Sequence, residues 1–148
     1  MEEKQHPVTI VLVEDDPGHA ALIEKNLRRA GIMTPIVNLN NGREALDYLA
    51  VKKGPETPSI LMLLDLTMPV LDGYEVLKAV KSDARSRCMP VVVLTAADNP
   101  REAERCYKLG CNAYITKPVG YEQFSDTMRK LGMFLSIVEL PMIEELYG

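Results

Sequence analysis

The sequence predicts an α/β fold, a doubly wound, five-stranded parallel sheet with helices on both faces. Three observations lead to this prediction. Short apolar runs alternate with helical patterns five times along the chain, which is typical of repeated βαβ units. The run 60–64 is continuously apolar, as expected for a strand covered on both faces of a sheet. The length of 148 residues, with 47% apolar residues, suits one compact domain with a buried core.

Strands and helices are predicted in strict alternation. The strands are expected at residues 8–13, 35–39, 59–64, 90–95 and 113–116. The helices are expected at residues 17–30, 42–53, 74–82, 100–109 and from 121 onward. The strand at 59–64 is the most continuously apolar of the five, so we place it at the centre of the sheet.

Local signals mark several of these boundaries. Asp16 precedes Pro17, so its carboxylate can cap the first helix with proline in the first turn, the role we favour for it. Gly31 ends that helix. The segment 54–58 contains a glycine and two prolines and predicts a turn. The pair Asp72-Gly73 predicts a turn and the start of the third helix.

The chain shows no internal repeat, and nothing after residue 120 is long enough for a second domain. We therefore expect a single domain over residues 1–148. Its core is expected at about 8–135, and an extension of the last helix at about 136–148.

Composition and charge exclude several classes of function. A net charge of -4 gives no field that would gather a phosphate backbone, so we expect no nucleic-acid partner. No stretch approaches the roughly 20 apolar residues of a membrane span, and the polar start 1–6 lacks a signal peptide's apolar region. A cytoplasmic protein without a membrane partner is expected. The three cysteines form no C-x-x-C pair, which argues against a disulfide framework or a structural zinc site.

Acidic residues follow two of the predicted strands. Asp65 comes directly after the central strand, where ligands of open α/β sheets bind. Glu14 and Asp15 follow the first strand and would lie near Asp65 if the two strands are neighbours. An all-oxygen site with few carboxylates and several waters is what Mg²⁺ prefers. Compensation of a helix dipole by the upstream acids is an equally good explanation at this stage.

Two further residues are expected at the same edge of the sheet. Thr95 ends the fourth strand and Lys117 follows the fifth. A hydroxyl and an ammonium group there could bind phosphoryl oxygens, and the carboxylate of Asp65 could accept a phosphoryl group if a cation screens the incoming charge. Considered alone, a threonine or a lysine at the end of a strand more often has no special role.

Four motifs together resemble the receiver domain of bacterial response regulators over roughly residues 8–135. They are V-L-V-E-D-D, L-L-D-L-T-M-P-V-L-D-G-Y-E-V-L, V-V-V-L-T-A and A-Y-I-T-K-P. The steps of 30 residues from Asp65 to Thr95 and 22 from Thr95 to Lys117 suit that family. The resemblance implies a flavodoxin-like sheet with strand order 2-1-3-4-5. The segments 114–119 and 134–141 further resemble the single-domain regulators that partner bacterial phytochrome histidine kinases.

The resemblance also implies the chemistry of the site. Asp65 would take a phosphoryl group from a phosphohistidine of a sensor histidine kinase. Mg²⁺ would be bound by Asp15, Asp65 and the backbone carbonyl of Thr67, with Glu14 acting through metal-bound water. Lys117 would pair with the phosphoryl group.

A switch is implied by the same resemblance. Thr95 would move to donate its hydroxyl once the phosphoryl group is present, and Tyr114 would turn inward into the space vacated near Thr95. The change would alter the surface formed by the fourth helix, the fifth strand and the fifth helix. Such a protein is a signalling receiver that assists its own phosphorylation and dephosphorylation, and we do not expect an enzyme.

The last helix carries more apolar residues than one covering face requires. One stripe with helical spacing is expected to face the sheet: Phe124, Met128, Leu131, Leu135 and Val138. A second set lies off that stripe: Met133, Phe134, Ile137 and Leu140. We predict a homodimer through this helix and its extension, in preference to capping within one chain.

The sequence argues against two other functions. A Mg²⁺-dependent phosphatase with an aspartate nucleophile needs a second acid two residues after it, where this chain has Thr67. A scaffold that is never phosphorylated is also disfavoured, because all the chemical positions hold competent residues. His6 and His19 are expected to be solvated surface groups.

Overall fold

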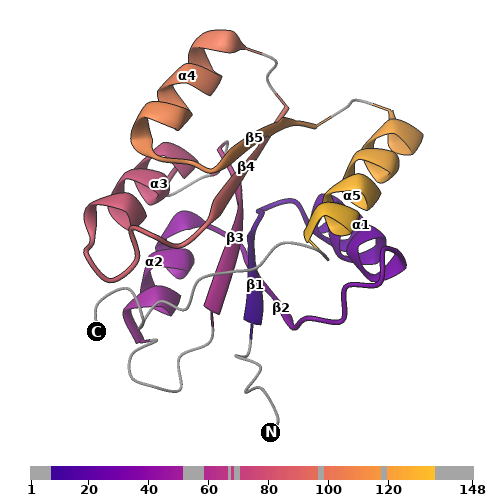
Figure 1. The fold of residues 1–148 in the computed structure, drawn as a ribbon, viewed down its shortest axis with the longest axis horizontal. Helices are drawn as coiled ribbons and strands as arrows, with labels where there is room; N and C mark the ends of the chain where they lie inside the picture. The colour runs from indigo at the N-terminus through magenta and orange to yellow at the C-terminus, as the bar shows by residue number, and fades with distance from the viewer. Residues whose placement is uncertain are drawn as a thin grey trace, which may run out of the picture.

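A computed structural model describes residues 8–51, 59–66, 68, 71–96, 99–117 and 120–135 of the chain, without the side chains of residues 121, 134 and 135. The strands are β1 (Val8–Val13), β2 (Ile36–Leu39), β3 (Ser59–Asp65), β4 (Val91–Thr95) and β5 (Ala113–Thr116). The helices are α1 (Pro17–Arg29), α2 (Gly42–Val51), α3 (Gly73–Ser82), α4 (Pro100–Leu109) and α5 (Tyr121–Leu135). Figure 1 shows them as one sheet between two helical layers.

The predicted fold class and strand order are confirmed. All four strand pairings are parallel, and the order is β2-β1-β3-β4-β5. Within the described residues, the predicted boundaries differ from the observed ones by a residue or two; the strand at 59–64, for example, extends to Asp65. Every residue of β3 is buried, as its continuous apolar run and central position require.

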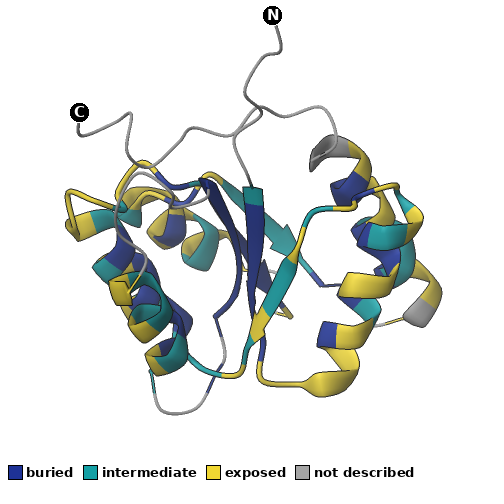
Figure 2. Cartoon of the chain, turned by 90° about the horizontal axis from the view of Figure 1, so that it is seen from below, coloured by how far each residue is buried: buried dark blue, intermediate teal, exposed yellow. Residues whose placement is uncertain are grey.

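Side chains alternate along each strand, so the sheet has an apolar core on each face. One core lies under α2, α3 and α4 and includes Val13, Met62 and Leu64. The other lies under α1 and α5 and includes Leu12 and Leu63. Figure 2 shows buried strands between helices whose outward faces are exposed. The two cores fix the strands, and therefore fix the sheet edge at which the strands end.

Helix α5 presents the predicted apolar stripe to the core. Phe124, Met128 and Leu131 are buried, whereas Met133, from the second apolar set, is 58% exposed. The remaining side chains of the two sets, those of Phe134, Leu135, Ile137, Val138 and Leu140, lie outside the described part of the structure, as does the predicted extension at 136–148. The homodimer therefore stays a prediction, and of the second apolar set only Met133 is described, as an exposed side chain.

The predicted helix starts are confirmed by their capping geometry. The carboxylate of Asp16 accepts hydrogen bonds from the backbone amides of Gly18 and His19, at 2.8 and 3.1 Å. Asp72 accepts one from the amide of Glu75 at 3.0 Å. These caps satisfy amide groups that a helix leaves without a partner at its N-terminus. None of the helices in the described residues combines the length and apolar character needed to cross a bilayer.

Candidate functional site

Three carboxylates meet where β1 and β3 end. The two strands pair in parallel, with Val13 beside Leu64, so the residues that follow Val13 come next to Asp65. One carboxylate oxygen from each of Glu14, Asp15 and Asp65 lies within 4.8 Å of the others. Glu14 and Asp65 are buried, and Asp15 is exposed at the mouth of the site. The predicted acidic cluster therefore forms, with one member open to solvent.

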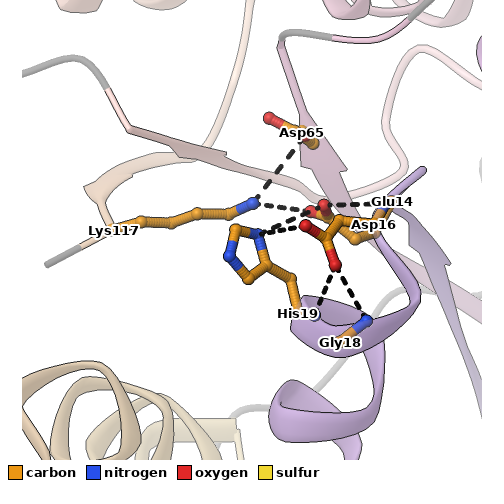
Figure 3. A network of polar contacts seen from close by, with 6 residues as sticks. All are labelled: Glu14, Asp16, Gly18, His19, Asp65 and Lys117. Carbon is orange, nitrogen blue, oxygen red and sulfur yellow. Dashed lines mark hydrogen bonds and ion pairs between the residues drawn. The ribbon is translucent and has the colours of Figure 1, made fainter. Parts of the chain in front are cut away.

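Lys117 supplies the positive charge of the site. Its Nζ lies 2.6 Å from Oε2 of Glu14 and 3.7 Å from Oδ2 of Asp65, as Figure 3 shows. The lysine follows β5, is 7% exposed, and donates its backbone amide to the carbonyl of Thr95 at 2.6 Å. A buried carboxylate needs such a partner, because desolvation of an unpaired charge is costly. Lys117 was expected to pair with a phosphoryl group, and here it holds Glu14.

The charges of this cluster fit a divalent cation. With all three carboxylates ionised, Lys117 compensates one of three negative charges and leaves two within a few ångströms. Carboxylates so close repel one another unless a cation neutralises them. Oxygen donors with one open side are the ligand set that Mg²⁺ takes together with waters. The donors present therefore suit that ion. The predicted backbone ligand, the carbonyl of Thr67, lies outside the described residues.

The first turn of α1 forms the rim of the site. Asp16 lies beside Glu14 but uses its carboxylate as the helix cap, and the bond from the His19 amide is the main cause that lowers the pKa of Asp16. His19 places Nδ1 3.6 Å from Oε1 of Glu14, and Figure 3 shows the imidazole turned toward that carboxylate. Its ring also lies against Phe124, with centroids 5.7 Å apart. The imidazole is half-exposed, but it borders the site, which the sequence prediction of a solvated histidine did not anticipate.

Thr95 and Tyr114 lie on the neighbouring strands. Thr95 is the last residue of β4 and is 1% exposed. In the β3–β4 pairing Asp65 stands beside Leu94, so Thr95 ends one residue further along at the same sheet edge. Tyr114 of β5 is half-buried, and its hydroxyl donates a hydrogen bond of 2.8 Å to Oε1 of Glu102 on α4.

The structure thus gathers five of the seven predicted site residues at one edge of the sheet: Glu14, Asp15, Asp65, Thr95 and Lys117. Tyr114 points its hydroxyl to α4, and Thr67 is not described. Sequence reasoning missed Glu102 as the partner of Tyr114. The two residues are on different elements, and only the packing of α4 on β5 brings them together.

Comparisons with known proteins agree with this geometry. Residues 10–129 match the model of the response regulator receiver domain. The probable methanogenesis regulatory protein FilR2 of Methanothrix harundinacea is 38% identical over 87% of this chain and 84% of its own. The polar-differentiation response regulator DivK of Brucella anthropi is 34% identical over 83% of this chain and 94% of its own.

Solved structures resemble the chain over nearly its whole length. A receiver domain from Rhodospirillum rubrum has a TM-score of 0.85 and 48% identity, covering 90% of this chain and 96% of its own. The Mn²⁺-bound response regulator Rcp1 has a TM-score of 0.82 and 31% identity, with 92% and 100% covered. The phosphorylated cyanobacterial phytochrome response regulator RcpA has a TM-score of 0.81 and 35% identity, with 93% and 100% covered.

The fold, the acidic cluster and these matches define a receiver of two-component signalling. The chain belongs to the response regulator receiver family. Its relatives include single-domain regulators such as DivK, and its structural neighbours include regulators of phytochrome signalling.

Proposed function

We propose that this chain is a stand-alone response regulator that accepts a phosphoryl group on Asp65 from a sensor histidine kinase, with Mg²⁺ as cofactor. The observation that carries the proposal is the cluster of Glu14, Asp15 and Asp65 with Lys117 bridging two of them. The proposed function is that of one domain over residues 1–148 with a core at about 8–135, and the receiver match over residues 10–129 supports that core.

The proposed metal ligands combine the acidic cluster with what the family resemblance implies. Asp15, Asp65 and the backbone carbonyl of Thr67 would bind Mg²⁺ directly, and Glu14 would act through a metal-bound water. When bound, the ion screens the negative charge of an incoming phosphoryl group, which an anionic nucleophile otherwise repels. The structural neighbour Rcp1 has been solved in a Mn²⁺-bound form, which supports the proposal that this chain binds a divalent cation.

The position of Asp65 in the acidic cluster supports it as the phosphoryl acceptor. A carboxylate oxygen of Asp65 attacks the phosphorus of a phosphohistidine, the phosphorus–nitrogen bond breaks, and the kinase imidazole leaves with the electron pair. Lys117 then exchanges Glu14 for a phosphoryl oxygen, a move of its Nζ within the same small cluster. The ammonium group stabilises the charge of the phosphorylated state.

The proposed output is a change at the surface of α4, β5 and α5. Thr95 would donate its hydroxyl to the phosphoryl group, and Tyr114 would turn inward toward the space that Thr95 leaves. Because Tyr114 is bonded to α4, its movement would alter that surface. The protein would be a signalling receiver that assists its own phosphorylation and dephosphorylation, located in the cytoplasm as is usual for its family.

The proposed partners are a kinase and a second copy of the chain. Relatives in phytochrome signalling support a phytochrome-type kinase, and a phosphotransfer time course with such kinases tests that choice. The dimer would form through α5 and the extension after it, where Met133 is exposed. A monomeric mass by light scattering at tens of micromolar, with and without phosphorylation, would reject the dimer.

Intact mass spectrometry tests the central proposal. Wild type, Asp65→Asn and Asp16→Asn are incubated with Mg²⁺ and acetyl phosphate, with EDTA as control. We expect one added phosphoryl group on wild type and on Asp16→Asn, since asparagine also caps a helix. No gain is expected on Asp65→Asn or in EDTA. The absence of any gain on wild type, together with no Mg²⁺ binding, would favour an unphosphorylated scaffold.

A further inference from the structure

A second polar cluster lies away from the acidic site, between α3, α4 and β5. We call its four members, Tyr74, Glu102, Arg105 and Tyr114, the Glu102 cluster. The carboxylate of Glu102 accepts the hydroxyl proton of Tyr114 at 2.8 Å. Tyr74 lies at the start of α3, where burial raises the pKa of its phenol and this carboxylate is near enough to raise it further. Glu102 on α4 is thus bonded to a strand on one side and lies near a helix on the other.

Arg105 reinforces the link to α3. Its guanidinium carbon lies 3.9 Å from the centroid of the Tyr74 ring, in the geometry of a cation–π contact. Glu102 and Arg105 are three residues apart, so both project from the same side of α4. Burial and Glu102 together raise the pKa of Tyr74 to about 12, and the same causes raise that of Tyr114. Both phenols therefore stay protonated and remain hydrogen-bond donors at neutral pH.

The Glu102 cluster holds the residue that the proposed switch has to move. Tyr114 cannot turn toward Thr95 while its hydroxyl stays on Glu102, which lies on α4. A hydrogen bond to a carboxylate in a half-buried place is stronger than one between neutral groups. Its loss therefore opposes the inward turn.

We propose that Glu102 is a latch that keeps Tyr114 and the surface of α4 and β5 in the unphosphorylated arrangement, with Tyr74 positioning the carboxylate. The inference rests on the proposed function, because the latch has a purpose only if phosphorylation of Asp65 releases it. Coupling is reciprocal: a change that weakens the latch favours the released state, and the released state favours phosphorylation.

A simpler role for Glu102 has to be separated from the latch. An acid in the first turn of α4 stabilises the helix through its dipole, whatever Tyr114 does. Glu102→Gln keeps the size of the side chain, weakens the bond to Tyr114 and removes the charge near Tyr74. Glu104→Gln is the matched control, since Glu104 is exposed on the same helix and pairs with Lys108 at 3.0 Å. Tyr74→Phe removes the second hydroxyl and keeps the ring under Arg105.

The first readout uses unphosphorylated protein labelled with 3-fluorotyrosine. The chain has six tyrosines, and Tyr114→Phe assigns the signal of Tyr114. The fluorine shift is compared in H₂O and D₂O, because the difference reports how far the ring is exposed to solvent. We expect Glu102→Gln to change this difference for Tyr114, Tyr74→Phe to change it less, and Glu104→Gln to leave it as in wild type. An unchanged value in Glu102→Gln would overturn the latch.

The second readout is the rate of phosphorylation by acetyl phosphate with Mg²⁺. We expect Glu102→Gln to react up to about tenfold faster than Glu104→Gln, a factor that corresponds to about 1.4 kcal/mol. Equal rates would also overturn the latch, even with an altered Tyr114 signal. If wild type gains no phosphoryl group, the proposed function fails. The fluorine signal then still decides whether Glu102 holds Tyr114.

Discussion

Helix α4 on one face of the sheet is held in place differently from α1 and α5 on the other. Helices α1 and α5 bury apolar side chains in one core, among them Ile23, Leu27 and Met128, and they pack closely against each other. On the other face, α2 and α3 also bury apolar side chains, whereas Cys106 is the one buried residue in α4. Helix α4 adds the polar contacts of the Glu102 cluster to β5 and α3.

This difference separates the firmly packed helices α1 and α5 from an adjustable helix, α4. Apolar burial is lost wholly when a helix leaves its place, so α1 and α5 stay fixed. Polar contacts can be exchanged for others at little net cost, because each hydrogen bond contributes modestly to stability. The element that a switch has to move is therefore α4, whereas α1 and α5 keep the acidic site in position. Three predictions test this comparison, in order of decreasing effect.

Truncation of a core side chain should cost far more on α5 than on α4. Met128 is fully buried, so Met128→Ala is expected to lower the free energy of unfolding by about 2–5 kcal/mol. Leu109 on α4 is half-buried, and Leu109→Ala is expected to lower it by no more than about 1.5 kcal/mol. Urea unfolding of both variants measures the difference. Equal losses would mean that α4 is anchored as firmly as α5.

Gly132→Ala should destabilise the protein, although alanine usually favours a helix. A Cβ at Gly132 would lie 2.6 Å from the Cβ of Ala30, so α1 and α5 would have to move apart. We expect a loss of about 1–3 kcal/mol by urea unfolding, as for other overpacked cores. The pair Gly132→Ala with Ala30→Gly should recover part of it. Increased stability in the single variant would show that the two helices adjust easily.

Alkaline pH should weaken the α4 side through Tyr74. Its pKa of about 12 exceeds the ordinary value of 10.0, so the unfolded chain loses this proton first. The contribution to stability is full below pH 10 and is lost as the pH rises toward 12. Between pH 9 and pH 11, wild type should lose about 1 kcal/mol more than Tyr74→Phe. Tyr107→Phe is the control, because Tyr107 is 53% exposed on α4; an equal benefit from both variants would contradict the assignment.

Much of the fold and part of the site were predictable from the sequence. Alternation of side chains in strands and capping of helices are signals that extend over a few residues. Asp16 and Asp72 therefore marked helix starts correctly. A parallel sheet brings the carboxyl ends of all its strands to one edge. Acids at the carboxyl ends of β1 and β3 had to meet there, and Glu14, Asp15 and Asp65 do.

The pairing of individual side chains was less predictable. Lys117 was expected at the correct edge, but its bond to Glu14 joins residues 103 positions apart and depends on how β5 leaves the sheet. His19 carries no signal of its approach to Glu14, because the angle of α1 decides it. The partner of Tyr114 depends on how α4 packs on β5. These contacts depend on how helices and strands pack against one another. The hydrophobic periodicity and the secondary-structure propensity of a single helix or strand do not encode that packing.

The neighbouring positions of α1 and α5 have a consequence for biosynthesis. About 90 residues lie between the end of α1 and the start of α5, and translation at about 5–20 residues per second needs roughly 5–20 s to make them. Until α5 emerges, two surfaces have no cover: the side of α1 that packs against α5, and the part of the sheet that α5 covers. A nascent chain of this topology is thus exposed to aggregation and to chaperones for most of its synthesis, and its last helix completes the fold.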